Sequence, residues 1–302
     1  MSRLDLVIAG TLVAVQLDGA MAALQSQLRD IFRGFLAPAG SAAVRLIVSY
    51  DHRTAFNQFA ANPALITQTE DSVPLLRRVA ELYPFDRPLV IGFRNGILAY
   101  RVGAQEALLY LFRSEERNIL VGSLLKLLFL FLAVVMVERD RLMVHGAGLR
   151  LGSEGTLFLG VSGAGKSTVA GYAARNDLLS DDAPMITRNG RSFAIHASPF
   201  SQVDLFDRKA ADHHRREAPL TRLVFLRQAD RLALEPRDKR SVVAELLREH
   251  IHGIAVMGGE LRGRAFAFCC DLCAAVPGFD LFFQNDAHFL TLFEGQDSRT
   301  EP

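Results

Sequence analysis

A glycine-rich loop in the second half of the chain carries a lysine and a serine at the spacing that binds a nucleoside triphosphate. The loop is Gly160-Val161-Ser162-Gly163-Ala164-Gly165-Lys166-Ser167-Thr168, a complete G-x-x-x-x-G-K-S pattern. Its glycines let backbone N–H groups wrap the phosphates, its lysine adds positive charge, and its serine hydroxyl can reach Mg²⁺. We predict that this phosphate loop (residues 160–168) binds ATP with Mg²⁺, and that Lys166 is catalytic.

The segments on either side of the phosphate loop fit that prediction. Gly155–Leu159 is short and apolar, as expected of a buried strand, and Ser167–Arg175 has the composition of a helix. A strand that enters the loop and a helix that leaves it are the context in which this motif binds phosphate, whereas a chance match in a glycine-rich linker would lack both.

Two neighbouring carboxylates follow the loop. Asp181 and Asp182 close the apolar segment that begins at Asp177, so they stand at the end of a short predicted strand. Carboxylates in that position could hold Mg²⁺ or take a proton from an attacking hydroxyl. The alternative is an Asp-Asp turn before Ala183-Pro184 with a structural role only.

A histidine precedes the loop by a similar distance. His145 begins an apolar stretch that alternates through Leu149 and Leu151, and Gly152–Gly155 supplies a turn, so a hairpin would return the chain to the phosphate loop. The histidine could therefore lie near the triphosphate. A hydrogen-bonded histidine of the core is the alternative.

Together, these features resemble the C-terminal kinase domain of the HPr serine kinase/phosphorylase family, and especially its divergent HPr-kinase-like members. They are also similar to the core of ATP-dependent phosphoenolpyruvate carboxykinase. The resemblance covers roughly residues 141–286, and its specific part is Val144–Asp182. It implies that Lys166 and the loop amides bind the β-phosphate and that Ser167 binds Mg²⁺. It further implies that Asp181 is the general base, that Asp182 helps to hold the metal, and that His145 lies near the transferred phosphate.

The resemblance implies an ATP-dependent kinase that transfers the γ-phosphate to a hydroxyl of a protein, a peptide or a small metabolite. The later glycine-rich signature of the bifunctional family has no clear counterpart, so phosphorylase activity is not part of the prediction. Two alternatives stay open: a regulatory protein that binds nucleotide with little turnover, and a membrane-tethered interaction protein.

Composition favours a soluble protein with no nucleic-acid partner, and the start of the chain favours a cytoplasmic location. The chain has 302 residues, half of them hydrophobic, and a formal net charge of +1, which gives no electrostatic footprint for nucleic acid. Asp5 and Asp18 interrupt the apolar start, so we expect no signal peptide.

One segment has the length of a membrane span. Ile119–Val137 is almost entirely apolar, but Lys126 lies near its middle, and the charges on its two flanks show no one-sided bias. A lysine at mid-bilayer costs about 2.5–3.5 kcal/mol on insertion scales. We therefore predict a helix buried between the two domains and no stable membrane insertion.

The fold class that we predict is α/β, with an N-terminal α/β module (1–115), an apolar connecting helix (116–140) and an HPr-kinase-like domain with a mixed sheet (141–302). In the first module we expect a strand-like run at Leu6–Leu17, a helix at Met21–Phe35, a β-rich run at Ala43–Tyr50 and a hairpin at Pro88–Val102 that turns at Asn95-Gly96. Such a module would serve substrate recognition or homo-oligomer formation. Asp51-His52-Arg53 in it reads as a solvated loop.

The three cysteines lie together in Cys269-Cys270-Asp271-Leu272-Cys273. A C-x-x-C pair could bind zinc, but a fourth ligand would have to come from a distant residue such as His252 or His288. The longer segment Arg264–Ala275 has helical spacing, which favours buried cysteines in a helix.

Two polar segments and several arginines complete the candidates. His196–Phe200 and Asp207–Arg216 lack apolar periodicity and could form a mobile loop that contacts substrate. A cation that stabilises the transferring phosphate is expected among four arginines. They are Arg215, Arg216, Arg222 and Arg227.

Overall fold

The fold is described from a computed structural model of the whole chain. The structure describes residues 2–38, 40–55, 64–66, 89–172, 177–200, 216–284 and 287–293. The protein is of the mixed α/β class with two mixed sheets, which confirms the predicted fold class. The chain divides into two compact units, one of residues 1–138 with 253–262, and one of residues 139–252 with 263–302.

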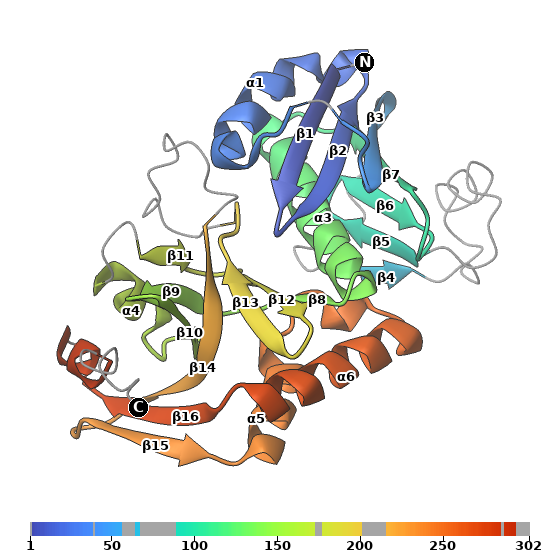
Figure 1. Cartoon of the computed structure of the whole chain (residues 1–302). Coiled ribbons are helices and arrows are strands. Elements are labelled where there is room, and N and C mark those ends of the chain that lie inside the picture. Colours follow the sequence, from blue (N-terminus) through green and yellow to red (C-terminus); the bar gives the residue numbers. More distant parts are fainter. Residues whose placement is uncertain are drawn as a thin grey trace. The chain divides into compact units, whose positions relative to one another are not determined.

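The first unit contains a sheet whose described strands lie in the order β1-β2-β3-β7-β6-β5-β4 (Figure 1). The strands are β1 (Ser2–Ile8), β2 (Thr11–Leu17), β3 (Val44–Ala55), β4 (Ala64–Ile66), β5 (Leu89–Phe93), β6 (Gly96–Tyr100) and β7 (Glu106–Arg113). Its helices are η1 (Gly19–Met21), α1 (Ala22–Ile31), η2 (Arg33–Phe35), α3 (Arg117–Glu138) and η5 (Ile254–Val256).

Two predictions for this unit are refined by the structure. The run Leu6–Leu17 forms a hairpin of two antiparallel strands, β1 and β2, which turns at Ala9-Gly10 where both residues have positive φ. The β5–β6 hairpin turns one residue earlier than predicted, at Arg94-Asn95, and Gly96 pairs with Phe93. Asp51–Arg53 lies within β3 and is therefore strand, which corrects the loop prediction.

Helix α3 confirms the prediction of a buried apolar helix, and it belongs to the first unit. It packs on β5, β6 and β7, and 72% of its most apolar 18-residue window is buried in the chain. It is the one helix in the described part of the chain that is long and apolar enough to cross a membrane. Lys126 is half-buried, with its ammonium 4.9 Å from the ring centroid of Phe129, so its charge interacts with an aromatic face of the same helix.

The second unit is built on a larger mixed sheet. Its described strands run β11-β9-β10-β14-β13-β12-β8, with β16 beside β14 and β15 beside β16. The strands are β8 (Arg141–Met143), β9 (Ala147–Leu151), β10 (Glu154–Leu159), β11 (Leu178–Ser180), β12 (Met185–Asn189), β13 (Ser192–His196), β14 (Glu217–Gln228), β15 (Ala233–Arg237) and β16 (Gly278–Phe283). The helices are α4 (Lys166–Tyr172), α5 (Lys239–Glu245), the π-helical turn η4 (Leu246–His250), α6 (Gly259–Ala275, which begins in the first unit) and η6 (Ala287–Leu292).

The elements expected around the phosphate loop are present. Strands β9 and β10 form the predicted hairpin, and β10 also pairs in parallel with β14. Helix α4 follows the loop, although residues 173–176 of the predicted helix lie outside the described residues. The apolar core beneath the loop joins Ala164 of the loop and Val169 of α4 to Phe158 of β10 and Phe289 of η6. This packing anchors the loop to the sheet.

Candidate functional site

The phosphate loop takes the sharp backbone path that its glycines permit. Gly163 and Gly165 have φ of +80° and +106°, in the region that side chains with a Cβ disfavour. A Cβ on Gly160 would stand 2.7 Å from the Cβ of Ala164, because the chain doubles back there and Ala164 donates its N–H to the Val161 carbonyl at 3.1 Å. The loop is therefore closed by its own backbone.

Lys166 folds back onto this loop. Its ammonium donates to the carbonyl oxygens of Gly160 at 2.7 Å and Val161 at 3.2 Å, and the residue is only 9% exposed. Burial lowers the pKa of Lys166, and the negative charge of Asp182 partly offsets that effect. A positive charge is thus held at the loop, close enough to Asp182 for the two groups to interact.

The outer part of the loop is open to solvent. Ser162, Gly163 and Ser167 are exposed, whereas Ala164 and Val169 are buried beneath them. Gln228, at the end of β14, donates from its side-chain amide to the Gly163 carbonyl at 2.9 Å. The loop therefore offers polar groups outward while its inner side is fixed to the core, as the binding of an external anion requires.

The two acids occupy a tight turn after β11. Ser180 is fully buried, and its hydroxyl accepts the backbone N–H of Ala183 at 3.0 Å, which fixes the turn. Asp181 is 5% exposed, whereas Asp182 is half-buried. The carboxylate of Asp182 contacts His145, and its negative charge opposes the lowering of the Lys166 pKa by burial.

His145 meets Asp182 at the junction of β8 and β9. Its Nδ1 lies 2.9 Å from Oδ1 of Asp182. The backbone holds the two residues together, because Gly146 donates its N–H to the Asp182 carbonyl at 3.0 Å. On its other side, His145 donates its own N–H to the carbonyl of His250 at 2.7 Å. His145, Asp182 and Lys166 are thus brought together from three segments.

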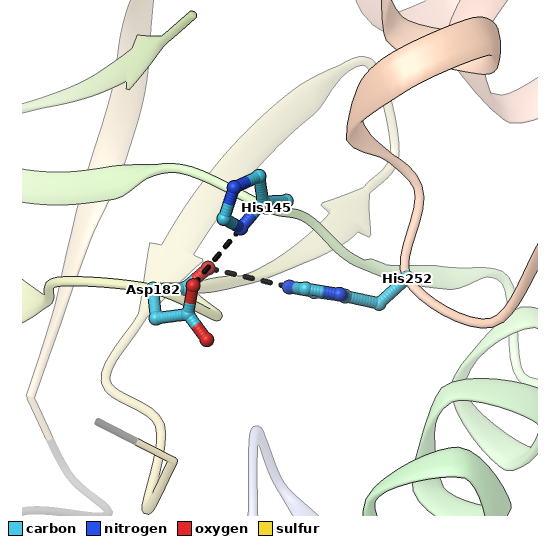
Figure 2. A group of neighbouring side chains, drawn as sticks. All are labelled: His145, Asp182 and His252. Carbon is cyan, nitrogen blue, oxygen red and sulfur yellow. Dashed lines mark hydrogen bonds and ion pairs between the residues drawn. The ribbon is translucent and has the colours of Figure 1, made fainter. Parts of the chain in front are cut away.

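Two further histidines join this site, and the motifs did not predict them there. His252 follows the π-helical turn η4, and its Nε2 lies 3.3 Å from the Asp182 carbonyl oxygen. His145, Asp182 and His252 form the His/Asp/His cluster, in which potential ligand atoms all lie within 4.8 Å of one another (Figure 2). The only sequence signal for these two residues was the pattern His250-Ile251-His252. Nothing in that pattern indicates that it lies beside His145, about 100 residues earlier in the chain.

His250 lies behind the cluster and positions it. It is 1% exposed, and its Nδ1 lies 3.0 Å from the His145 carbonyl oxygen. Since a carbonyl only accepts, Nδ1 carries the proton. Burial lowers the pKa of His250 and outweighs the opposing effect of this hydrogen bond, so the ring stays neutral.

Two of the candidate arginines, Arg222 and Arg227, form ion pairs within the second unit. Arg222 pairs with Glu154 at 2.7 Å. Arg227 hydrogen-bonds Glu245 and Asp280; burial would lower its pKa, but Glu245 raises it overall. Arg215 lies outside the described residues.

The predicted substrate loop is corrected in part. His196 is the last residue of β13, not part of a loop, and its two ring nitrogens contact Glu217 at 3.0 Å and Thr187 at 2.8 Å. Residues 201–215, which hold nearly all of the second polar segment, lie outside the described residues.

The cysteines lie on α6, as the helical spacing predicted. Cys269 and Cys273 are buried, and burial raises the pKa of both thiols, that of Cys273 to about 12. Thiols that stay protonated are poor nucleophiles and poor metal ligands. The one metal-competent cluster in the described part of the chain is the His/Asp/His cluster.

Comparison of the chain with models of known protein families and with curated protein sequences finds no match.

Proposed function

We propose that this protein is an ATP-dependent kinase of the HPr-kinase-like type, which transfers the γ-phosphate of ATP to a hydroxyl group. The observation that carries the proposal is the convergence of Lys166, Asp182 and His145 beside a complete phosphate loop. A loop that only braced the fold would need neither the buried ammonium nor a carboxylate and an imidazole opposite it.

The residues fit a triphosphate with magnesium. The Lys166 ammonium is held by two loop carbonyls, which are weaker partners for a cation than phosphate oxygens are. The exposed Ser167 hydroxyl is free of the core and would hold Mg²⁺ with help from Asp182. Magnesium would neutralise charge on the phosphates during transfer.

In the proposed reaction, Asp181 accepts the proton of the substrate hydroxyl. A bond forms between that oxygen and the γ-phosphorus, the bond from the γ-phosphorus to the β,γ-bridging oxygen breaks, and ADP leaves with the bridging oxygen. Lys166 stabilises the charge that moves toward the β-phosphate. His145, held beside Asp182, would lie near the transferred group. ATP chemistry in turn implies a cytoplasmic location, which we propose with it.

The test is to measure ATP affinity and γ-phosphate transfer for the full chain and for Lys166→Ala. We expect Mg²⁺-dependent ATP binding by the wild type and its loss in the variant, with transfer to an added protein, peptide or small alcohol acceptor. Binding without transfer to any acceptor would favour the regulatory nucleotide-binding protein. Equal ATP affinity of wild type and variant would remove the nucleotide site altogether.

A further inference from the structure

We propose that His145, Asp182 and His252 bind a divalent first-row transition-metal ion, with Zn²⁺ and Mn²⁺ as the favoured ions, at a site separate from Ser167 that shares the carboxylate of Asp182 with the magnesium expected there. The site is formed by three side chains of the second unit and does not require nucleotide. It extends the proposed function by adding a second cation beside the phosphate loop.

The separations of the ligand atoms fit one ion. Nδ1 of His145 and Oδ1 of Asp182 are 2.9 Å apart, and the potential ligand atoms of all three residues lie within 4.8 Å. Ligands about 2.1 Å from a tetrahedral zinc ion stand about 3.4 Å from each other. The distance between Nδ1 of His145 and Oδ1 of Asp182 is below that value, and no separation within the cluster exceeds 4.8 Å, so modest side-chain rotations would complete the coordination.

Each imidazole has a ring nitrogen that could bind a metal ion without the loss of a strong hydrogen bond. The buried Nδ1 of His145 makes no well-aligned hydrogen bond with any described residue, although it lies at ion-pair distance from Asp182. Nε2 of His252 makes a long contact, 3.3 Å, with the Asp182 carbonyl oxygen. Metal binding would replace that weak bond, with the ring proton moving to Nδ1 of His252.

The backbone already holds the three ligand residues together. Gly146, next to His145, donates to the Asp182 carbonyl, and the N–H of His252 donates to the Met143 carbonyl at 3.0 Å. Val144 and Ile251 form an isolated antiparallel bridge between the segment that carries His145 and the segment that carries His252. Little ordering is therefore left to occur when an ion binds, which favours affinity.

The chemistry of the ligands selects the ion. Two imidazoles and one carboxylate suit zinc and other transition ions, whereas Mg²⁺ prefers oxygen ligands. Three protein ligands leave at least one coordination position open, and the side chains of His145 and Asp182 are 32% and 14% exposed, so water or a phosphate oxygen can reach it. The charge of Lys166 opposes a cation here, so a triphosphate that neutralises Lys166 should increase metal affinity.

The alternative is an Asp–His contact that only orients the two side chains. A metal titration of the full chain, stripped of metal and free of nucleotide, separates the two. Co²⁺ binding would be followed by visible absorption and Zn²⁺ binding by calorimetry. We expect one ion per chain and a cobalt spectrum of low coordination number. His252→Gln should weaken binding about 10- to 100-fold or more, because even loss of a residue that merely orients a ligand has that effect.

The matched control is His288→Gln, since His288 is exposed and lies outside the cluster. It should bind metal as the wild type does, and circular dichroism should show that both variants are folded. Equal affinity of wild type and His252→Gln would overturn the proposal. If His252→Gln does not fold, the wild-type cobalt spectrum decides, and a spectrum of octahedral aqueous Co²⁺ alone would overturn the site.

The same preparations separate this inference from the proposed kinase. Loss of metal binding to the cluster with intact, Lys166-dependent ATP binding would reject the transition-metal site alone. Metal binding that depends on His252, in a chain that does not bind ATP, would support the metal site and reject the kinase.

Discussion

The ammonium of Lys166 lies 2.7 Å from the carbonyl oxygen of Gly160, the first residue of its own phosphate loop. A second contact, to the Val161 carbonyl at 3.2 Å, completes an internal brace across the loop. A nucleotide would have to exchange these two bonds for bonds to its phosphates. Lys166 therefore stabilises the loop when no nucleotide is bound, and in the proposed complex it would bind the phosphates instead.

Lys166→Ala should reduce both ATP affinity and stability. The loss of two hydrogen bonds from a charged donor, offset by removal of the cost of burying the ammonium, should lower the free energy of unfolding by about 1–2 kcal/mol. Urea denaturation of the nucleotide-free proteins measures this effect. An unchanged midpoint would show that the brace contributes nothing, whatever the ATP affinity.

Asp181→Asn should show whether Asp181 acts as a proton acceptor or as a metal ligand. The change keeps the size of the side chain but removes the base, so transfer should fall about 10²- to 10⁴-fold with ATP affinity nearly unchanged. Single-turnover transfer and ATP titration measure the two effects. Transfer at the wild-type rate would exclude Asp181 as the base.

Asp182→Asn should give a different pattern, because this carboxylate contacts His145 and interacts with Lys166. Both nucleotide binding in Mg²⁺ and transfer should fall, and added Mg²⁺ should restore part of each. If Asp182→Asn instead loses transfer with full ATP affinity, and Asp181→Asn does not, the roles of the two acids are exchanged.

Gly146→Ala should damage the cluster through the backbone. A Cβ at Gly146 would stand 2.8 Å from the backbone carbonyl oxygen of Phe158, so the chain next to His145 must shift. We expect a loss of about 1–3 kcal/mol in the free energy of unfolding. The control is Gly263→Ala, where a Cβ meets nothing within 4 Å and the helical position predicts a small gain. Equal stability of the two variants would contradict the close contact.

Glu245→Gln should weaken the charge network behind η4. Glu245 is 7% exposed and receives hydrogen bonds from Arg227 at 3.1 Å and Arg237 at 2.5 Å. Asp280 still pairs with both arginines in the variant, so we expect a loss of about 1–3 kcal/mol, measured by denaturation. Glu249→Gln, at an exposed carboxylate, is the control and should change little.

The pH dependence of stability gives a second measurement on Glu245. Burial would raise its pKa, but the hydrogen bonds from Arg237 and Arg227 lower it below the ordinary 4.5. Its contribution is therefore complete above that value and is lost as the pH falls through the lower folded-state pKa. The wild type should lose more stability than Glu245→Gln between about pH 6 and about pH 3. Parallel curves would mean that Glu245 titrates alike in both states.

His196 should make the protein sensitive to mild acid. Burial lowers its pKa below the ordinary 6.5; Glu217 opposes this effect and Arg141 adds to it. The unfolded chain then binds the proton first, so stability is complete above that value and is lost as the pH falls below it. His196→Gln should flatten the dependence between about pH 7 and about pH 5. Thermal unfolding at the two pH values tests this, and the same slope in both proteins would refute it.

Local sequence was sufficient for the phosphate loop and the elements beside it. The glycines dictate the turn, and the apolar run Leu157–Leu159 dictates the buried strand β10. The two acids come directly after a second short apolar strand, β11, whose end the sequence also shows. The β9–β10 hairpin was equally readable, since alternation and a glycine turn are short-range signals. The hairpin turn at Arg94-Asn95 was missed by one residue, because tertiary pairing and not the glycine alone sets the register.

What the sequence by itself determined was therefore the motif, the α/β class and the burial of α3. Only the tertiary structure decided that His252 faces Asp182, 70 residues away in the chain, and that Arg227 is held by Glu245 and Asp280. The physical reason is that a side chain's partners across a sheet depend on strand order and register, which arise from burial summed over the whole unit. No local pattern around His250-Ile251-His252 records that sum, whereas the glycines, the lysine and the serine that define the phosphate loop all lie within residues 160–168.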